Sequence, residues 1–337
     1  MGLFDDEYKK LNKAQKQAVD LIDGAVLVVA GPGTGKTQLL GMRVANILKR
    51  TDVSPQDILC LTFTNKAADN MQQRLLRLIG PEANGVVVKT FHGFAAEIMN
   101  RHPEHFWNGA RLSIAPDPLQ LEIAHRALAR LPQEHPLALK FAGQFTLVGD
   151  VQTAINLVKE AGLTPAKLRA VIHANLAYID QIEPELAKCG TLRVSAKTIP
   201  LIEDMVQKLP GQNIESLVRP LRSLDVVIKE SLQSAIEQAE IEGNNSALSQ
   251  WKRRWLQPFE GSYTMTAERQ RNTWWLGLAD AYDAYRQQMH SRNYYDYADM
   301  LGEVISQLET NPGLRADGQE QFQYVLIDEF QDTNAAQ

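Results

Sequence analysis

Four short, largely apolar runs along the chain have the length of β-strands. They are Ala25–Ala30, Ile58–Phe63, Val86–Thr90 and Tyr324–Ile327. The first two lead into segments in which apolar residues recur every three or four positions, as on one face of a helix. Apolar strands that alternate with amphipathic helices are typical of a parallel sheet covered on both faces. The pattern therefore predicts an α/β fold around a parallel sheet.

The pattern changes near residue 111. From there to residue 273, amphipathic helical patterns dominate, and no long buried strand interrupts them. A helix expected over Trp274–Met289 should lie back on the first domain. The chain is also longer than one hydrophobic core usually serves. We therefore predict a domain made of residues 1–110 and 274–337, interrupted by an all-helical insertion over residues 111–273.

Composition narrows the class of protein. Hydrophobic residues make up 44% and charged residues 22% of the chain, which is typical of a soluble globular protein. Two cysteines, Cys60 and Cys189, are too few for a disulfide framework or a cysteine-rich zinc site. No apolar run reaches the length of a membrane span, and the acidic start is unlike a signal peptide. We expect a cytoplasmic protein with no membrane partner.

The charge balance constrains but does not exclude nucleic acid as a partner. The formal net charge is -5, which argues against a surface that is basic all round. Binding depends on where the charges lie, so a local basic groove stays possible.

The strongest chemical signal follows the first predicted strand. Three glycines, Gly31, Gly33 and Gly35, allow successive backbone N–H groups to turn inward around an anion, and a helix begins beneath them. Lys36 is then placed to reach the β- and γ-phosphates of a nucleotide, and the Thr37 hydroxyl to ligate Mg²⁺. The alternative is an ordinary strand-to-helix turn, because Ala30 stands where the commonest form of this loop has Gly.

An acidic pair at the other end of the chain complements this loop. The run Tyr324–Ile327 ends in Asp328 and Glu329. A buried strand that delivers carboxylates at its C-terminal end is typical of the Walker B arrangement, in which one carboxylate holds Mg²⁺. We assign the metal to Asp328 and the positioning or deprotonation of the attacking water to Glu329. By itself the pair could equally be a solvated turn.

Weaker candidates lie at the other strand ends. Gln15, on a helix that Asn12 would cap, could read adenine through its amide or be an ordinary surface glutamine. Phe63, Asn65 and Lys66 lie at the C-terminal end of the second strand, at the edge where parallel sheets place their ligands; the alternative is that Thr64 or Asn65 only caps the helix that follows. Phe91 and His92 follow the third, where core packing is the alternative.

The predicted insertion carries one interleaved aromatic and basic segment, Trp251-Lys-Arg-Arg-Trp255. Such a mixture can grip single-stranded nucleic acid by stacking and phosphate neutralisation. The alternative is a solvated helix face with both tryptophans packed inward.

Six blocks in this order resemble the N-terminal part of superfamily 1 DNA helicases of the UvrD/Rep/PcrA type. The blocks are Leu11-Asn-x-x-Gln15, Ala30-Gly-x-Gly-x-Gly-Lys-Thr37, Thr62-Phe-Thr-Asn-Lys-Ala-Ala68, Thr90-Phe-His92, Asp296-Tyr-x-Asp299 and Asp328-Glu-Phe-Gln-Asp332. They cover the first domain, whereas the insertion matches only in position and helical character. The resemblance implies a RecA-like P-loop NTPase sheet, subdomain 1A, interrupted by a helical subdomain, 1B.

The resemblance also implies roles for individual residues. Those expected to bind Mg-ATP are Gln15, at the adenine, and Ala30, Gly31, Gly33, Thr34, Gly35, Lys36, Thr37 and Gln38, with Asp328 as the Mg²⁺ ligand and Glu329 as the catalytic base. Those expected to contact single-stranded DNA are Phe63, Thr64, Asn65, Phe91 and His92. Gln38 departs from the family pattern, because several relatives have an arginine there, next to the nucleotide.

The resemblance ends at Gln337, before the later motifs and the second RecA-like domain of such enzymes. Arginines of that second domain stabilise transition-state charge, and an arginine finger is worth about 10³ to 10⁵ in rate. We therefore expect this chain to be the N-terminal portion of an ATP-dependent, 3′ to 5′ DNA helicase acting on single-stranded or partly duplex DNA, and to turn ATP over slowly alone. Alternatives are the helicase portion of a helicase-nuclease subunit, or a DNA-binding module with little ATPase.

Overall fold

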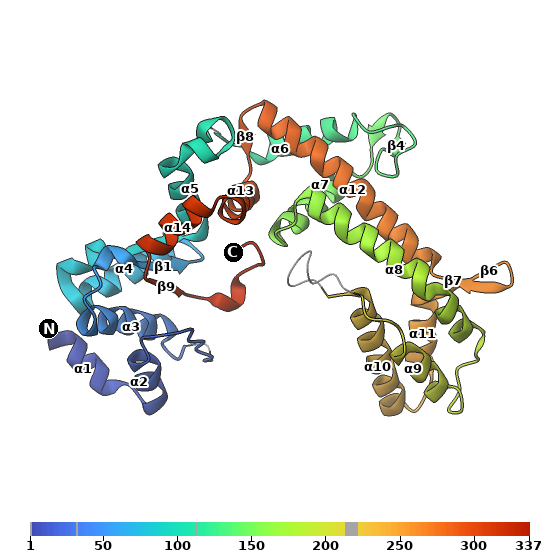
Figure 1. Ribbon diagram of the computed structural model, residues 1–337, viewed down its shortest axis with the longest axis horizontal. Helices are drawn as coiled ribbons and strands as arrows, with labels where there is room; N and C mark the ends of the chain where they lie inside the picture. The colour runs from blue at the N-terminus through green and yellow to red at the C-terminus, as the bar shows by residue number, and fades with distance from the viewer. Residues whose placement is uncertain (1, 32, 112, 213–221) are drawn as a thin grey trace. The chain divides into compact units, whose positions relative to one another are not determined.

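The computed structural model describes residues 2–31, 33–111, 113–212 and 222–337. The chain forms two compact units, one comprising Met1–Ile114 with Tyr295–Gln337 and the other Ala115–Tyr294. The protein is mostly helical, with a small parallel sheet in the first unit (Figure 1). Residues 274–294, which the sequence pattern placed in the first domain, belong to the second unit.

The first unit contains the elements on which the nucleotide and DNA candidates lie. Its helices are α1 (Gly2–Lys10), α2 (Lys13–Asp20), α3 (Lys36–Arg50), α4 (Asn65–Ile79), α5 (Phe91–Arg101), α13 (Tyr297–Thr310) and α14 (Pro312–Gln321). Its main strands are β1 (Ile58–Thr62), β2 (Val87–Thr90) and β9 (Tyr324–Ile327). Short 3-10 helices cover Pro55–Asp57, Gly80–Gly85, Pro103–His105, Trp107–Ala110 and Phe330–Asp332.

The three strands form a parallel sheet in the order β2-β1-β9. Leu59 pairs with Val87 on one side and Val325 on the other. Successive side chains of a strand point to opposite faces. Accordingly Cys60 packs with residues of α3 and α4, and Leu61 packs with residues of α5, α13 and α14. Helices thus cover both faces of the sheet (Figure 1).

The predicted first strand, Ala25–Ala30, is absent from this sheet. Its residues join none of the described strands, and Leu27 and Val29 are 73% and 88% exposed. An apolar run becomes a strand only where its backbone groups pair with a neighbouring strand. Within the described residues β9 pairs only with β1. The prediction of a buried strand here is therefore wrong for this structure, because the run lacks a paired neighbour.

The second unit is built mainly from helices. They are α6 (Asp117–Leu128), α7 (Val148–Glu160), α8 (Pro165–Thr191), α9 (Ile199–Gln207), α10 (Leu224–Glu242), α11 (Ser246–Trp255) and α12 (Thr266–Ser291). Two hairpins pair β4 (Lys140–Phe141) with β5 (Gln144–Phe145) and β6 (Gln257–Phe259) with β7 (Ser262–Thr264). Where the chain passes between the units, β3 (Ser113–Ile114) pairs with β8 (Tyr294–Tyr295).

Two hydrophobic clusters share the long helix α8. Its first half packs with α6, α7 and α12, and its second half packs with α9, α10 and α11. The helix predicted over Trp274–Met289 is the C-terminal part of α12, and it contributes Leu278, Tyr285 and Met289 to the first of these clusters. The expectation that it lies on the first domain is therefore wrong. Among the described residues, no helix is both long and apolar enough to cross a membrane.

Candidate functional site

The glycine-rich loop has the positive φ angles that its glycines allow. Gly33 and Gly35 take φ values of 73° and 86°, a region that side chains with a Cβ avoid. α3 begins directly after them at Lys36, and no side chain caps its N-terminus. The first N–H groups of α3 are therefore available to an anion. Pro32, within the loop, lies outside the described residues.

Polar contacts hold the loop together. The Thr34 hydroxyl donates to the carbonyl oxygen of Gly31 at 2.7 Å. The Lys36 Nζ atom lies 3.4 Å from the carbonyl oxygens of both Ala30 and Gly31. The Lys36 ammonium is thus held over the loop, where it adds a full positive charge to the partial charge of the helix N-terminus.

Gln15 reaches this loop from α2. Its Oε1 atom accepts from the Asn12 backbone N–H at 3.0 Å, and the Gln15 N–H donates to Asn12 Oδ1 at 2.9 Å. This reciprocal capping box fixes the side chain. Its Nε2 atom also donates to the Thr34 carbonyl oxygen at 3.4 Å. The predicted adenine-binding residue is therefore coupled to the loop and is not an isolated surface glutamine.

The acidic pair follows β9 directly. Asp328 is 7% exposed, its N–H donates to the Leu61 carbonyl oxygen at 2.9 Å, and its Oδ1 atom accepts from the Glu329 N–H at 3.0 Å. Glu329 has φ 52° and ψ 43°, a left-handed conformation that costs energy for any residue other than glycine. Such strain clusters at functional sites. Gln331 Nε2 donates to the Glu329 carboxylate.

A pocket of about 400 Å³ brings together residues from opposite ends of the chain. Thr37, Asp328 and Glu329 line it, and α4 contributes Ala67, Asn70, Gln73, Arg74 and Arg77. Hydroxyl and carboxylate oxygens are ligands that Mg²⁺ accepts, so the donor set fits this ion. The arrangement can hold a metal-bound anion between a basic helix face and an acidic strand end.

The α4 residues of the pocket were not among the predicted site residues, and Arg74 is the one held beside Gln38. Its NH1 atom donates to Gln38 Oε1 at 2.8 Å, while Gln38 Nε2 donates to Glu7 Oε2 at 3.3 Å. At Gln38, where the sequence departs from the expected family pattern, an arginine from α4 therefore lies directly beside the glutamine. The sequence feature that could have indicated Arg74 is its spacing from Asn70 and Arg77, which places three polar residues on one face of a helix.

The predicted DNA residues follow the C-terminal ends of β1 and β2. Because the strands are parallel, these ends lie at the same edge of the sheet as Asp328. Phe63 is 46% exposed, and Asn65 is exposed too. Thr64 caps α4, its Oγ1 atom accepting from the Ala67 N–H at 3.1 Å. Phe63 and Asn65 are thus open to a ligand, whereas Thr64 has a capping role.

The two residues after β2, Phe91 and His92, differ in exposure. Phe91 is 6% exposed and packs in the core between the sheet and α13. His92 is half-buried, and its ring meets the exposed Tyr297 ring edge to face, with 5.5 Å between centroids. Burial lowers the pKa of His92 below 6.5, so the neutral form dominates at pH 7. His92 is therefore the accessible residue of this pair, and it contacts the exposed Tyr297 at the start of α13.

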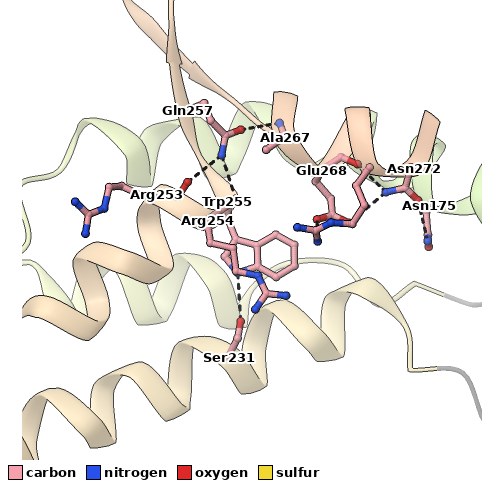
Figure 2. A network of polar contacts seen from close by, with 10 residues as sticks. Asn175, Ser231, Arg253, Arg254, Trp255, Gln257, Ala267, Glu268 and Asn272 are labelled. Atoms are coloured by element: carbon pink, nitrogen blue, oxygen red, sulfur yellow. Dashed lines mark hydrogen bonds and ion pairs between the residues drawn. The ribbon is translucent and has the colours of Figure 1, made fainter. Parts of the chain in front are cut away.

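The tryptophans of α11 do not form a stacking surface. Trp251 and Trp255 are 5% and 1% exposed, and both indole N–H groups donate to Ser231 Oγ, at 3.0 and 3.3 Å. Figure 2 shows Trp255 directed toward Ser231. The hypothesis that these rings stack on bases is therefore wrong, because the amphipathic pattern of α11 places both in the core.

The parallel sheet, the glycine loop and the acidic strand end are the features that the sequence predicted for a helicase N-terminal domain, and comparison with known proteins identifies the family. The family model for the UvrD/REP helicase N-terminal domain matches residues 11–337. The chain belongs to this family.

Curated relatives are ATP-dependent DNA helicases named PcrA. The chain is 44% identical to that of Staphylococcus epidermidis over 93 residues, which are 28% of this chain and 13% of the relative. It is 33% identical to that of Bacillus subtilis over 150 residues, which are 44% of this chain and 20% of the relative. The matched region thus spans a fifth or less of the length of these relatives.

Proposed function

We propose that this chain is the N-terminal, nucleotide-binding portion of an ATP-dependent DNA helicase. The observation that carries the proposal is the pocket that Thr37 shares with Asp328 and Glu329, although nearly three hundred residues separate them along the chain. Lys36 and the N-terminus of α3 would hold the β- and γ-phosphates. Thr37 and Asp328 would ligate Mg²⁺, which would neutralise charge on the transferred phosphoryl group. Glu329 would orient the attacking water.

The proposal includes a RecA-like sheet in the nucleotide-bound protein. The exposed run Ala25–Ala30 precedes the phosphate loop, and the outer edge of β9 is unpaired within the described residues. Pairing of this run with β9 would bury Leu27 and Val29 and place the loop beside Asp328. A bound nucleotide would favour this arrangement, because Lys36 and Asp328 would then act on the same ligand.

DNA would bind at the edge of the sheet that carries Phe63, Asn65, His92 and Tyr297. Exposed aromatic rings offer stacking platforms for unpaired bases. Phe63 and Asn65 follow β1, as does α4, which lines the nucleotide pocket, so binding at one site would affect the other through this short shared segment. This proximity gives a physical basis for hydrolysis that depends on DNA.

The test is ATP hydrolysis by the full-length protein that contains this chain, with and without single-stranded DNA. We expect DNA to stimulate turnover and Lys36→Ala to abolish it. Lys49→Ala, at the exposed far end of the same helix, is the matched control and should hydrolyse ATP normally. The 337-residue chain alone should turn over slowly, because catalytic arginines from a second domain would be missing. Turnover that ignores DNA would contradict the proposal.

A further inference from the structure

Three side chains that can bind a metal ion lie together just after α5. His102 follows the last residue of that helix, and Glu104 and His105 belong to the 3-10 helix that comes next. One potential ligand atom from each lies within 4.8 Å of the other two. His102 and His105 are half-buried, whereas Glu104 is exposed. Two imidazoles and a carboxylate thus converge on one small region.

The distances between these atoms are close to the spacing of ligands around a metal ion. Glu104 Oε1 lies 3.9 Å from His102 Nδ1 and 3.6 Å from His105 Nε2. Bonds of about 2.1 Å in a tetrahedral arrangement place neighbouring ligand atoms about 3.4 Å apart. Small side-chain rotations would close the remaining difference, and the exposed Glu104 side chain is free to make them.

The charge of this group also favours a cation. Among the described residues, no lysine or arginine forms an ion pair with Glu104, which lies near the two imidazoles instead. The nearby Glu97, by contrast, pairs with both Lys89 and Arg101. A neutral imidazole offers a lone pair and carries no charge. A cation between the three side chains would therefore balance the carboxylate and accept both lone pairs.

Asn311 supports the His105 ring without blocking its nitrogens. The Asn311 Oδ1 atom caps α14 by accepting from the Gly313 and Leu314 N–H groups, at 3.1 and 3.2 Å. Its Nδ2 atom lies 3.0 Å from His105 Nδ1 and 3.4 Å from Nε2. The lone pairs of these two nitrogens point to opposite sides of the ring, so a group close to both lies over the ring face. One nitrogen can then bind a metal while the other keeps its proton.

The backbone that carries the three side chains is also held in place. The His105 N–H donates to the His102 carbonyl oxygen, and the Phe106 N–H donates to that of Pro103, both at 3.1 Å. Phe106 is 6% exposed and packs in the hydrophobic core beside α5. Ligands that are already fixed lose little conformational freedom when an ion binds.

We propose that His102, Glu104 and His105, here named the post-α5 site, bind a Zn²⁺ ion, with water as the fourth ligand. Two histidines and one glutamate are a donor set that Zn²⁺ accepts in this arrangement. Imidazole nitrogen suits Zn²⁺, whereas the hydroxyl and carboxylate oxygens of Thr37 and Asp328 suit Mg²⁺. The two sites therefore select different ions, and the post-α5 site does not depend on the proposed function.

Calorimetric titration of the chelator-treated 337-residue chain with ZnCl₂, in excess Mg²⁺, tests the assignment. Wild type should bind one Zn²⁺ at this site. His105→Gln and Glu104→Gln should each weaken binding at least about tenfold, because loss of a group that only orients a ligand already costs about 10- to 100-fold in affinity. His173→Gln, at an exposed histidine of α8, is the matched control and should bind Zn²⁺ as wild type does.

A second measurement separates ligand loss from misfolding. Without metal, all three variants should melt at the wild-type temperature. Zn²⁺ should raise the melting temperature of wild type and His173→Gln but not that of His105→Gln, because only a folded chain with the site intact gains from the ion. Co²⁺ in place of Zn²⁺ should give wild type the strong visible absorption of a four-coordinate ion, and His105→Gln should lose it.

Three results would overturn the assignment. Unchanged Zn²⁺ affinity in His105→Gln and Glu104→Gln would show that these side chains are not ligands. An equal loss in His173→Gln would reduce the binding to surface histidines in general. Loss of Zn²⁺ in Asp328→Asn, with full binding in His105→Gln, would place the ion in the nucleotide pocket. DNA-stimulated ATP hydrolysis is measured separately, so each of these results would leave the proposed function standing.

Discussion

Replacing Arg74 by alanine should weaken nucleotide binding strongly, although this residue lies outside every recognised block. Its guanidinium lines the pocket with Thr37 and Asp328, and the 2.8 Å hydrogen bond to Gln38 holds it in place. A hydrogen bond to a charged group contributes about 1.5 to 3 kcal/mol. At 1.4 kcal/mol for each tenfold change, Arg74→Ala should raise the dissociation constant of Mg-ADP about 10- to 150-fold.

The assay is titration of the 337-residue chain with a fluorescent ADP analogue in the presence of Mg²⁺. Arg74→Lys should recover part of the loss, because lysine keeps the charge but not the planar guanidinium. Arg101→Ala is the control, since Arg101 pairs with Glu97 on α5 and lines no part of this pocket. Thermal melting without nucleotide checks that each variant is folded. Affinity of Arg74→Ala within twofold of wild type would show that Arg74 does not contribute to nucleotide binding.

Three further predictions concern the helical unit and are measured by urea unfolding. Ser231→Ala should destabilise the protein by about 1 to 3 kcal/mol, because two buried indole N–H groups lose their acceptor; an unchanged midpoint would contradict this. Gly190→Ala should cost about 1 to 3 kcal/mol through the clash with Tyr263, and the cost should shrink in a Tyr263→Ala background. Burial lowers the pKa of His135 below 6.5 despite the nearby Asp280, so the unfolded chain binds more protons than the folded one and stability should rise with pH up to about 6.5. His135→Gln should flatten that rise. An equal slope in this variant would show that His135 does not cause the pH dependence of stability.

The sheet could be predicted from the sequence because burial on both faces demands continuous apolar strands. Three of the four apolar runs are strands, and the described sheet consists of them. Ala25–Ala30 shows the limit of this rule. Its composition is that of a buried strand, but composition does not supply the paired neighbour on which a strand depends.

The candidate site was predictable where local chemistry dictates it. Gly33 and Gly35 take positive φ, and the acidic pair directly follows an apolar run of strand length, so both features could be predicted from the sequence once they were considered together. Arg74 could not be predicted as a site residue, because its distance from the phosphate loop depends on how α4 packs on α3. Phe91 and His92 are adjacent in sequence, yet one is buried and the other accessible.

The tryptophans of α11, in the helical unit, also show that the sequence does not tell which face of a helix is buried. Trp251 and Trp255 are four positions apart, which puts them on one face of a helix without saying whether that face is buried. The structure buries it and leaves the intervening cations outside. In that segment Arg253 and Arg254, which lie between the two rings, are the exposed residues.

The proposed function requires Lys36 and Asp328 to act on one magnesium-bound nucleotide. A crystal structure of this chain with Mg²⁺ and a non-hydrolysable ATP analogue tests it most directly. We expect the β- and γ-phosphates to lie against Lys36 Nζ and the N-terminus of α3, with Mg²⁺ bound by the Thr37 hydroxyl and the Asp328 carboxylate. A nucleotide bound elsewhere, or one that contacts the loop while Asp328 faces away from its metal, would contradict it.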